Sequence, residues 1–357
     1  MTPTKLNEVV PVPPPAYHRS LARSLHLHAL YLVDHLHLFT ICQLAVTFAH
    51  RQCPPPLPAG PGGRPRTYTD ASILLMALLR TLWRLTYEEV QHWLQDWPAL
   101  ALACGFALDT QGHPRVPSKS LQSKRLAALG APIGESLFLL SVRVARRAGL
   151  TRGWDVIIDS APILAWRRAD RDAAVGHAPA QHPRKLLLGY RVHTLVCRGT
   201  GLPLFYLVAP ANGHDAPFAH PLLVLAQRWL DLRPRWVRLD AGYWGLRLIQ
   251  WIHEVVKAIV IMPWNPKRQK RRDGLPPTWT ADELGKRTSI ERFFGRVMIF
   301  FRLHRPPVFG WTAVAQRVAL TFTATWIIAL AAYQAGRPEL IRSPRRVLAH
   351  YWEDGEL

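Results

Sequence analysis

The chain has 357 residues, and 49% of them are hydrophobic, which is enough to bury a core divided over two or three domains. Charged residues make up only 19%, which excludes a disordered polyampholyte. The 45 lysines and arginines outnumber the 24 aspartates and glutamates, and the formal charge of +21 favours a polyanionic partner such as nucleic acid.

The N-terminal part predicts helices joined by a linker. Residues 1–66 predict an arm, a histidine-rich helical segment and a Pro/Gly-rich linker. Residues 67–150 predict a helical leader domain, in which Thr69 caps one helix and Thr86 with Glu89 forms the capping box of the next. Small helices in a basic chain are compatible with a DNA-reading domain and equally with a plain helical bundle.

A β-rich pattern begins at Trp154 and continues in a regular order. Strands are predicted over residues 156–158, 189–197, 204–209, 236–239 and 258–262, with helices over 218–230, 245–256 and from 282 or 286 to 301. Three successive strands followed by strands that alternate with helices predict an α/β fold, a ribonuclease-H-like mixed sheet of five strands flanked by helices. This domain is expected over residues 151–335, before a tail at 336–357.

Three features argue against export and against a membrane span. The four cysteines have neither a CxxC pair nor zinc-ligand spacing, and they predict buried, reduced thiols in a cytoplasmic protein. The N-terminus has no apolar signal region. The longest apolar stretch, residues 318–333, is short for a bilayer and predicts a buried helix, so no membrane partner is expected.

Carboxylates at the predicted strand ends are the candidates for chemistry. Asp159 and Asp240 each end an apolar strand, where an α/β sheet exposes functional groups, and carboxylate oxygens bind hard cations such as Mg²⁺. Glu291, isolated in an apolar and basic helix, is the candidate third acid. A salt bridge from Glu291 to Arg287, four residues earlier, is an alternative compatible with metal binding.

These motifs resemble the DDE transposases of bacterial insertion sequences, in the group with a Y-x2-R-x3-E-x6-K signature. The resemblance rests on IIDSAPI at Asp159, RLDAGYWG at Asp240, and Arg287-x3-Glu291. The segment LLLGYRVHTLV…NGHDAPF also resembles the family's second and third strands and the loop after them. The likeness covers about residues 70–335, including the family's helical leader domain.

The resemblance implies a catalytic site and its partners. Asp159, Asp240 and Glu291 would hold two Mg²⁺ (or Mn²⁺) ions for DNA cleavage at the element's ends and for strand transfer into target DNA. The implied partners are double-stranded DNA, as terminal repeats and target, within a homodimer or larger synaptic complex. The implied location is the bacterial cytoplasm, in association with the nucleoid.

Two positions depart from the signature. Leu284 stands at its tyrosine and Met298 at its lysine, a residue that contacts DNA in the family. A catalytically impaired relative that acts as a DNA-binding repressor is therefore the alternative function. A metal nuclease of the same fold without strand transfer is a third possibility.

Further residues are assigned to the site or to its surroundings. Support of the catalytic carboxylates is expected from His214, Asp215 and Tyr243. Asp155 is predicted to face solvent, and Glu283 to cap a helix. Asp170 and Asp172 are predicted to lie in a solvated loop. The candidates for DNA contacts are Lys185, Arg191, Lys267, Arg268, Lys270, Arg271, Arg272, Arg287, Arg292 and Arg296.

Overall fold

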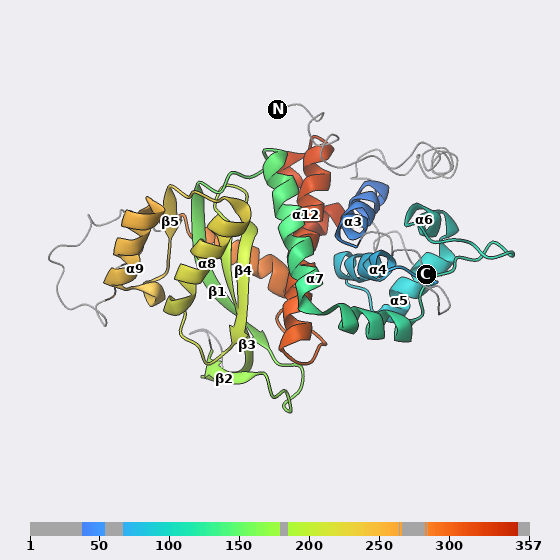
Figure 1. Ribbon diagram of the computed structural model, residues 1–357, viewed down its shortest axis with the longest axis horizontal. Helices are drawn as coiled ribbons and strands as arrows, with labels where there is room; N and C mark the ends of the chain where they lie inside the picture. The colour runs from blue at the N-terminus through green and yellow to red at the C-terminus, as the bar shows by residue number, and fades with distance from the viewer. Residues whose placement is uncertain are drawn as a thin grey trace, which may run out of the picture. The chain divides into compact units, whose positions relative to one another are not determined.

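The computed structural model describes residues 38–53, 67–178, 185–263, 265, 283 and 285–348. By its internal contacts the chain divides into two compact units, one of Met1–Ala148 with Val318–Leu357 and the other of Gly149–Arg317. Figure 1 shows the described part of the first unit as helices, whereas the second contains the sheet.

The first unit is built from amphipathic and buried helices. Its helices are α3 (Leu38–Gln52), α4 (Asp70–Leu82), α5 (Tyr87–Asp96), α6 (Pro98–Ala103), α7 (Lys119–Arg147), most of α12 (Trp311–Gln334), the 3-10 turn η5 (Pro338–Leu340) and α13 (Pro344–Leu348).

The predicted helix starts of this unit are confirmed. The hydroxyl of Thr69 accepts a hydrogen bond from the Ser72 amide, and Thr86 and Glu89 cap each other's backbone amides at the start of α5. Such caps satisfy amides that have no partner inside the helix. The sequence pattern thus locates both helix starts.

Two helices are long and apolar enough to cross a membrane by length and composition, namely α7 and α12. The apolar window of α12 is 89% buried within the fold, as in a core helix, and this agrees with the buried helix predicted at residues 318–333. All four cysteines are buried free thiols, as predicted.

The described residues of the second unit contain one mixed sheet of six strands. The strands are β1 (Asp155–Leu164), β2 (Ala174–His177), β3 (Leu186–Cys197), β4 (Leu202–Pro210), β5 (Trp236–Arg238) and β6 (Ile259–Ile261). The helical elements of this unit are α8 (Ala216–Leu230), η2 (Ala241–Tyr243), α9 (Leu246–Trp251), the π-helical turn η3 (Ile252–Val256), α11 (Thr288–Gly295) and the π-helical turn η4 (Arg296–Phe300).

The strand order confirms the predicted ribonuclease-H-like fold. β3 pairs antiparallel with β1 and β4, while β1, β5 and β6 run parallel to one another. The short strand β2, which was not predicted, pairs with the beginning of β3 and raises the number of strands from five to six. Its residues have little apolar alternation, and no local pattern therefore predicts a strand there.

Strand β1 is longer than predicted, and this changes the place of Asp159. The apolar run Val156–Ile158 is completely buried, but the strand continues to Leu164 because it pairs with β3 along its whole length. Asp159 therefore lies in the middle of β1, opposite Thr194, rather than at its end. Asp159 nevertheless lies at an edge of the sheet, because the neighbouring parallel strand β5 ends close to it.

Candidate active site

The register of β1 and β5 brings Asp159 and Asp240 together. Ile157 pairs with Arg238, and extending this parallel register by two residues places Asp159 level with Asp240. Side chains two residues apart on a strand share a face. Both carboxylates therefore lie on one face of the sheet, the face that also carries the side chains of Asp155 and Arg238.

Arg287 lies between the two carboxylates. This residue directly precedes α11, which packs against β1. Its Nη1 donates to Oδ1 of Asp240 at 3.0 Å, and its Nη2 donates to Oδ2 of Asp159 at 3.4 Å. The guanidinium is 16% exposed. One cation therefore contacts two acids that are far apart in sequence.

Burial raises the pKa of Asp159 to about 6. The Ser160 amide, which donates to Oδ1 at 2.8 Å, and the Arg287 charge oppose this shift, whereas the charges of Asp240 and Asp215 add to it. Desolvation disfavours the ionised form, and negative neighbours disfavour it further. The site therefore concentrates negative charge that a cation would stabilise.

Asp215 joins a second polar group beside Asp159. The Ser160 hydroxyl donates to Oδ1 of Asp215 at 2.7 Å, and Nη1 of Arg191 donates to the same oxygen at 3.3 Å. His193 is buried, stacks on Phe218 at 3.8 Å between ring centroids, and holds Nδ1 3.7 Å from Asp215. Asp215 thus lies close enough to Asp159 for its charge to act on that carboxylate, and its supporting role stays a prediction.

Tyr243 also lies in this region, and Gly242 keeps space open within it. Tyr243 is buried, and burial raises its pKa well above the usual value, with further contributions from the charges of Asp215 and Asp159. A Cβ added to Gly242 would lie 3.8 Å from Oδ2 of Asp240 and 3.9 Å from Oδ2 of Asp215. A larger side chain at position 242 would therefore project between the two carboxylates.

The structure does not bring Glu291 or His214 into this group. Glu291 is exposed in the first turn of α11 and makes no ion pair with a described residue, so the alternative pairing with Arg287 is absent. His214 is exposed as well. Within the described parts of the chain, no three acidic, histidine or cysteine residues lie close enough to hold a metal ion.

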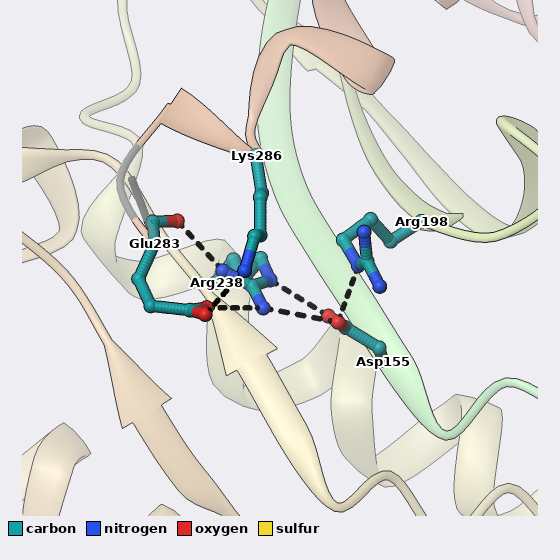
Figure 2. A network of polar contacts seen from close by, with 5 residues as sticks. All are labelled: Asp155, Arg198, Arg238, Glu283 and Lys286. Carbon is teal, nitrogen blue, oxygen red and sulfur yellow. Dashed lines mark hydrogen bonds and ion pairs between the residues drawn. The ribbon is translucent and has the colours of Figure 1, made fainter. Parts of the chain in front are cut away.

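A buried arginine fixes the segment before α11 (Figure 2). Arg238, 3% exposed, donates from Nε and Nη2 to the Asp155 carboxylate at 2.8 and 3.0 Å. It also donates to the backbone carbonyl and carboxylate of Glu283 at 2.7 and 2.9 Å. Lys286 and Arg198 complete the network. The prediction that Asp155 faces solvent was therefore wrong, whereas the predicted helix cap at Glu283 stays a prediction.

A signal for this network exists in the sequence. Arg238 lies within the apolar run WVRL, and a charge in a buried strand requires partners. Arg191 and His193 carry a similar signal, since they alternate on one face of β3 and both approach Asp215. The partners themselves come from distant segments, which no local pattern identifies.

The predicted DNA-contacting residues have different surroundings. Arg191 and Arg287 turn toward carboxylates, and Arg296 donates to the Gly201 carbonyl at 2.8 Å. Lys185 and Arg292 are exposed. Their contact with DNA stays a prediction. The candidates outside the described residues are Lys267, Arg268, Lys270, Arg271 and Arg272.

The sheet topology and the aspartates on adjacent parallel strands define a ribonuclease-H-like domain with a carboxylate site. Residues 152–327 match the family described as the transposase DDE domain. The chain thus carries a transposase domain, as its motifs indicated. No curated protein matches it in sequence.

Two solved structures are similar over most of the chain. One is a piggyBac transposase synaptic complex with hairpin DNA, with a TM-score of 0.42, 10% identity, and coverage of 92% of this chain and 81% of that chain. The other is a Mos1 transposase paired-end complex with the left transposon end, with a TM-score of 0.23, 11% identity, and coverage of 78% and 82%.

Proposed function

We propose that this chain is a transposase that cleaves DNA at the ends of an insertion sequence and transfers the strand into target DNA. The observation that carries the proposal is the meeting of Asp159 and Asp240 on one face of the sheet, with Arg287 between them. The transposase DDE domain match covers all three residues. A cluster of acids with one arginine suits a reaction at a phosphate, because carboxylates can hold a metal cation and the arginine can bind the phosphate oxygens.

The donor set fits a hard divalent cation at the aspartates. Carboxylate oxygens are the ligands that Mg²⁺ and Mn²⁺ prefer, and the position between Asp159 and Asp240 already holds one positive charge, that of Arg287. Asp159 and Asp240 would hold the metal, with Glu291 as the third acid and two ions in all. When bound, such ions stabilise the charge that develops on the phosphate and lower the pKa of a water or hydroxyl.

The residues of the chain have separate tasks in this proposal. Arg287 supplies a planar pair of N–H donors, which suits a phosphate once the aspartates have another counterion. Asp215 and Arg191 hold Ser160, and thereby the strand position of Asp159. Glu291 lies one helical turn after Arg287, and its exposed side chain leaves it open to a ligand.

Nicking of DNA that carries the inverted repeats flanking the gene tests this function. We expect nicks only with Mg²⁺ or Mn²⁺, loss of nicking in Asp159→Asn with DNA binding intact, and a joined target product from the unmodified chain. Nicking without any joined product indicates a metal nuclease instead. We place the reaction in the bacterial cytoplasm, in a homodimer or larger synaptic complex.

A catalytically impaired, DNA-binding repressor is the second candidate. Met298 occupies the signature's lysine position, and it lies half-buried in η4, where it offers no charge. Sequence-specific binding to the terminal repeats with no nicking in either metal supports the repressor. Restoration of nicking by Met298→Lys would show that this one position accounts for the defect.

A further inference from the structure

An arginine-rich loop follows β1 at the end of the strand that points away from β5. This arginine loop comprises residues 166–172, with the sequence WRRADRD. It contacts the segment before α12, where Arg305 donates to the Trp166 carbonyl at 3.3 Å, and the first residue of α12, where the Trp311 amide donates to Asp172 at 2.9 Å. The loop is therefore fastened at both ends.

The two acids of the arginine loop are used within the fold. Asp170 is 5% exposed, and it accepts hydrogen bonds from the Tyr190 hydroxyl at 2.8 Å and from the Gly310 amide at 3.2 Å. Asp172 accepts from the first residue of α12, where the amides at a helix N-terminus favour a carboxylate. The prediction of a solvated loop was therefore wrong for the buried Asp170, whereas Asp172 is exposed, as predicted.

The arginines of the same loop face outward. Arg167, Arg168 and Arg171 are exposed, and none of their side chains has a hydrogen bond or ion pair with the described part of the chain. Trp166 is 43% exposed, and the Arg305 guanidinium lies 5.4 Å from its ring centroid. The loop thus presents positive charge that no described residue pairs, beside an aromatic ring, while Asp170 is turned inward and Asp172 is bonded to the start of α12.

We propose that the arginine loop and Arg305 form a second contact surface for the phosphate backbone of duplex DNA, separate from the site at the aspartates. This inference rests on the proposed function, since the DNA that contacts the loop is the duplex whose phosphate lies at Asp159 and Asp240. Unpaired guanidiniums bind phosphate oxygens in pairs and release counterions. A loop already anchored by Asp170 and Asp172 loses little conformational freedom on binding.

The charge of the chain favours DNA over another copy as the occupant. With a formal charge of +21, a second copy would bring like charge to this surface. The part of β1 between Asp159 and its last residue, Leu164, separates the carboxylate from the loop by about 17 Å at the rise of a strand. Duplex DNA advances about 3.4 Å per base pair. The contacts therefore fall about five to seven base pairs from the phosphate at Asp159.

Two triple variants of equal charge test the surface. The loop variant is Arg167→Ala with Arg168→Ala and Arg171→Ala. The control is Arg152→Ala with Arg233→Ala and Arg235→Ala, three exposed arginines near Trp154 before the other end of β1. The measurement is the slope of log affinity for terminal-repeat duplex against log salt concentration. We expect the loop variant to lose about two to three units of slope, and the control less than one.

Neutral methylphosphonates placed about five to seven base pairs from the cleaved bond locate the contacts. They should weaken binding of the unmodified chain but not of the loop variant. Equal losses of slope in both triple variants, or none in the loop variant, would overturn the inference. The loop variant should unfold at the temperature of the unmodified chain, since its arginines have no side-chain partners among the described residues.

The failure of this inference and of the proposed function are distinguishable. A loop-dependent salt slope without any nicking keeps the DNA surface and removes the catalytic proposal. Normal nicking with an unchanged slope in the loop variant keeps the catalytic proposal and removes the surface. Binding of the loop to anionic lipid vesicles, with no effect on DNA affinity, would also overturn the inference.

Discussion

Nη1 of Arg287 lies 3.0 Å from Oδ1 of Asp240, and its other terminal nitrogen reaches Asp159. Because Arg287 directly precedes α11, this contact ties the start of the helix that carries Glu291 to two parallel strands. The arginine is mostly buried and is the positive charge between two acids that would otherwise repel each other. This contact reduces the repulsion between Asp159 and Asp240, and the Arg287 guanidinium lies where a metal cation would bind.

Replacement of Arg287 should therefore raise the response to metal. Arg287→Ala leaves the two carboxylates without a counterion, and we expect the metal-free protein to lose about 1–3 kcal/mol of unfolding free energy. Mg²⁺ or Mn²⁺ should restore more stability to this variant than to the unmodified chain, because no guanidinium competes. Thermal unfolding in chelator and in excess Mn²⁺ measures both effects. An unchanged response to metal would contradict this account.

Arg238 should contribute far more to the free energy of unfolding than the partly exposed Lys286. Arg238→Met leaves Asp155 and Glu283 without their buried partner, and such losses cost about 3–5 kcal/mol. Lys286→Ala removes a partly exposed partner of Glu283 and should cost less than about 1 kcal/mol. Urea unfolding of both variants checks the difference. Equal effects would mean that Arg238 does not anchor the segment before α11.

The sequence predicts the sheet well because its strands have clear apolar and alternating patterns. The buried run Val156–Ile158 and the alternation in β3 each identify a strand without tertiary information. The motif around Asp240 likewise marks the end of β5. These signals depend only on neighbouring residues, so one sequence is enough to detect them.

The partners of the charged residues could not be predicted in the same way. Asp155, Arg238 and Glu283 lie on three separate segments, and only the folded register brings them together. Asp170 has the sequence surroundings of a solvated loop, yet Tyr190 and Gly310 make it a buried acceptor. The position of Glu291 outside the group of carboxylates also depends on the orientation of α11 and not on the motif.

His193 should make the stability of the protein depend on pH. Burial, together with the Arg191 charge, lowers its pKa to about 4 against the opposing effect of Asp215. The unfolded chain takes up this proton near pH 6.5, whereas the folded protein resists until about pH 4. The stability from neutral His193 is therefore complete above pH 6.5 and is lost as the pH falls toward 4, by up to about 1.4 kcal/mol per pH unit.

His193→Phe should remove this part of the pH dependence. Neither ring nitrogen has a hydrogen-bond partner among the described residues, and phenylalanine can keep the stack on Phe218. Urea unfolding at pH 5 and pH 7 compares the variant with the unmodified chain. We expect a smaller loss of stability at pH 5 in the variant, and an equal loss would show that His193 is not the titrating group.

The most direct test of metal binding by Asp159 and Asp240 is a change of metal preference in cysteine variants. Mn²⁺ accepts a sulfur ligand more readily than Mg²⁺ does. We predict that Asp159→Cys and Asp240→Cys bind terminal-repeat DNA, fail to nick it in Mg²⁺, and regain measurable nicking in Mn²⁺. Full nicking in Mg²⁺, or no recovery in Mn²⁺ by variants that remain folded and bound to DNA, would contradict the assignment of these two carboxylates as metal ligands.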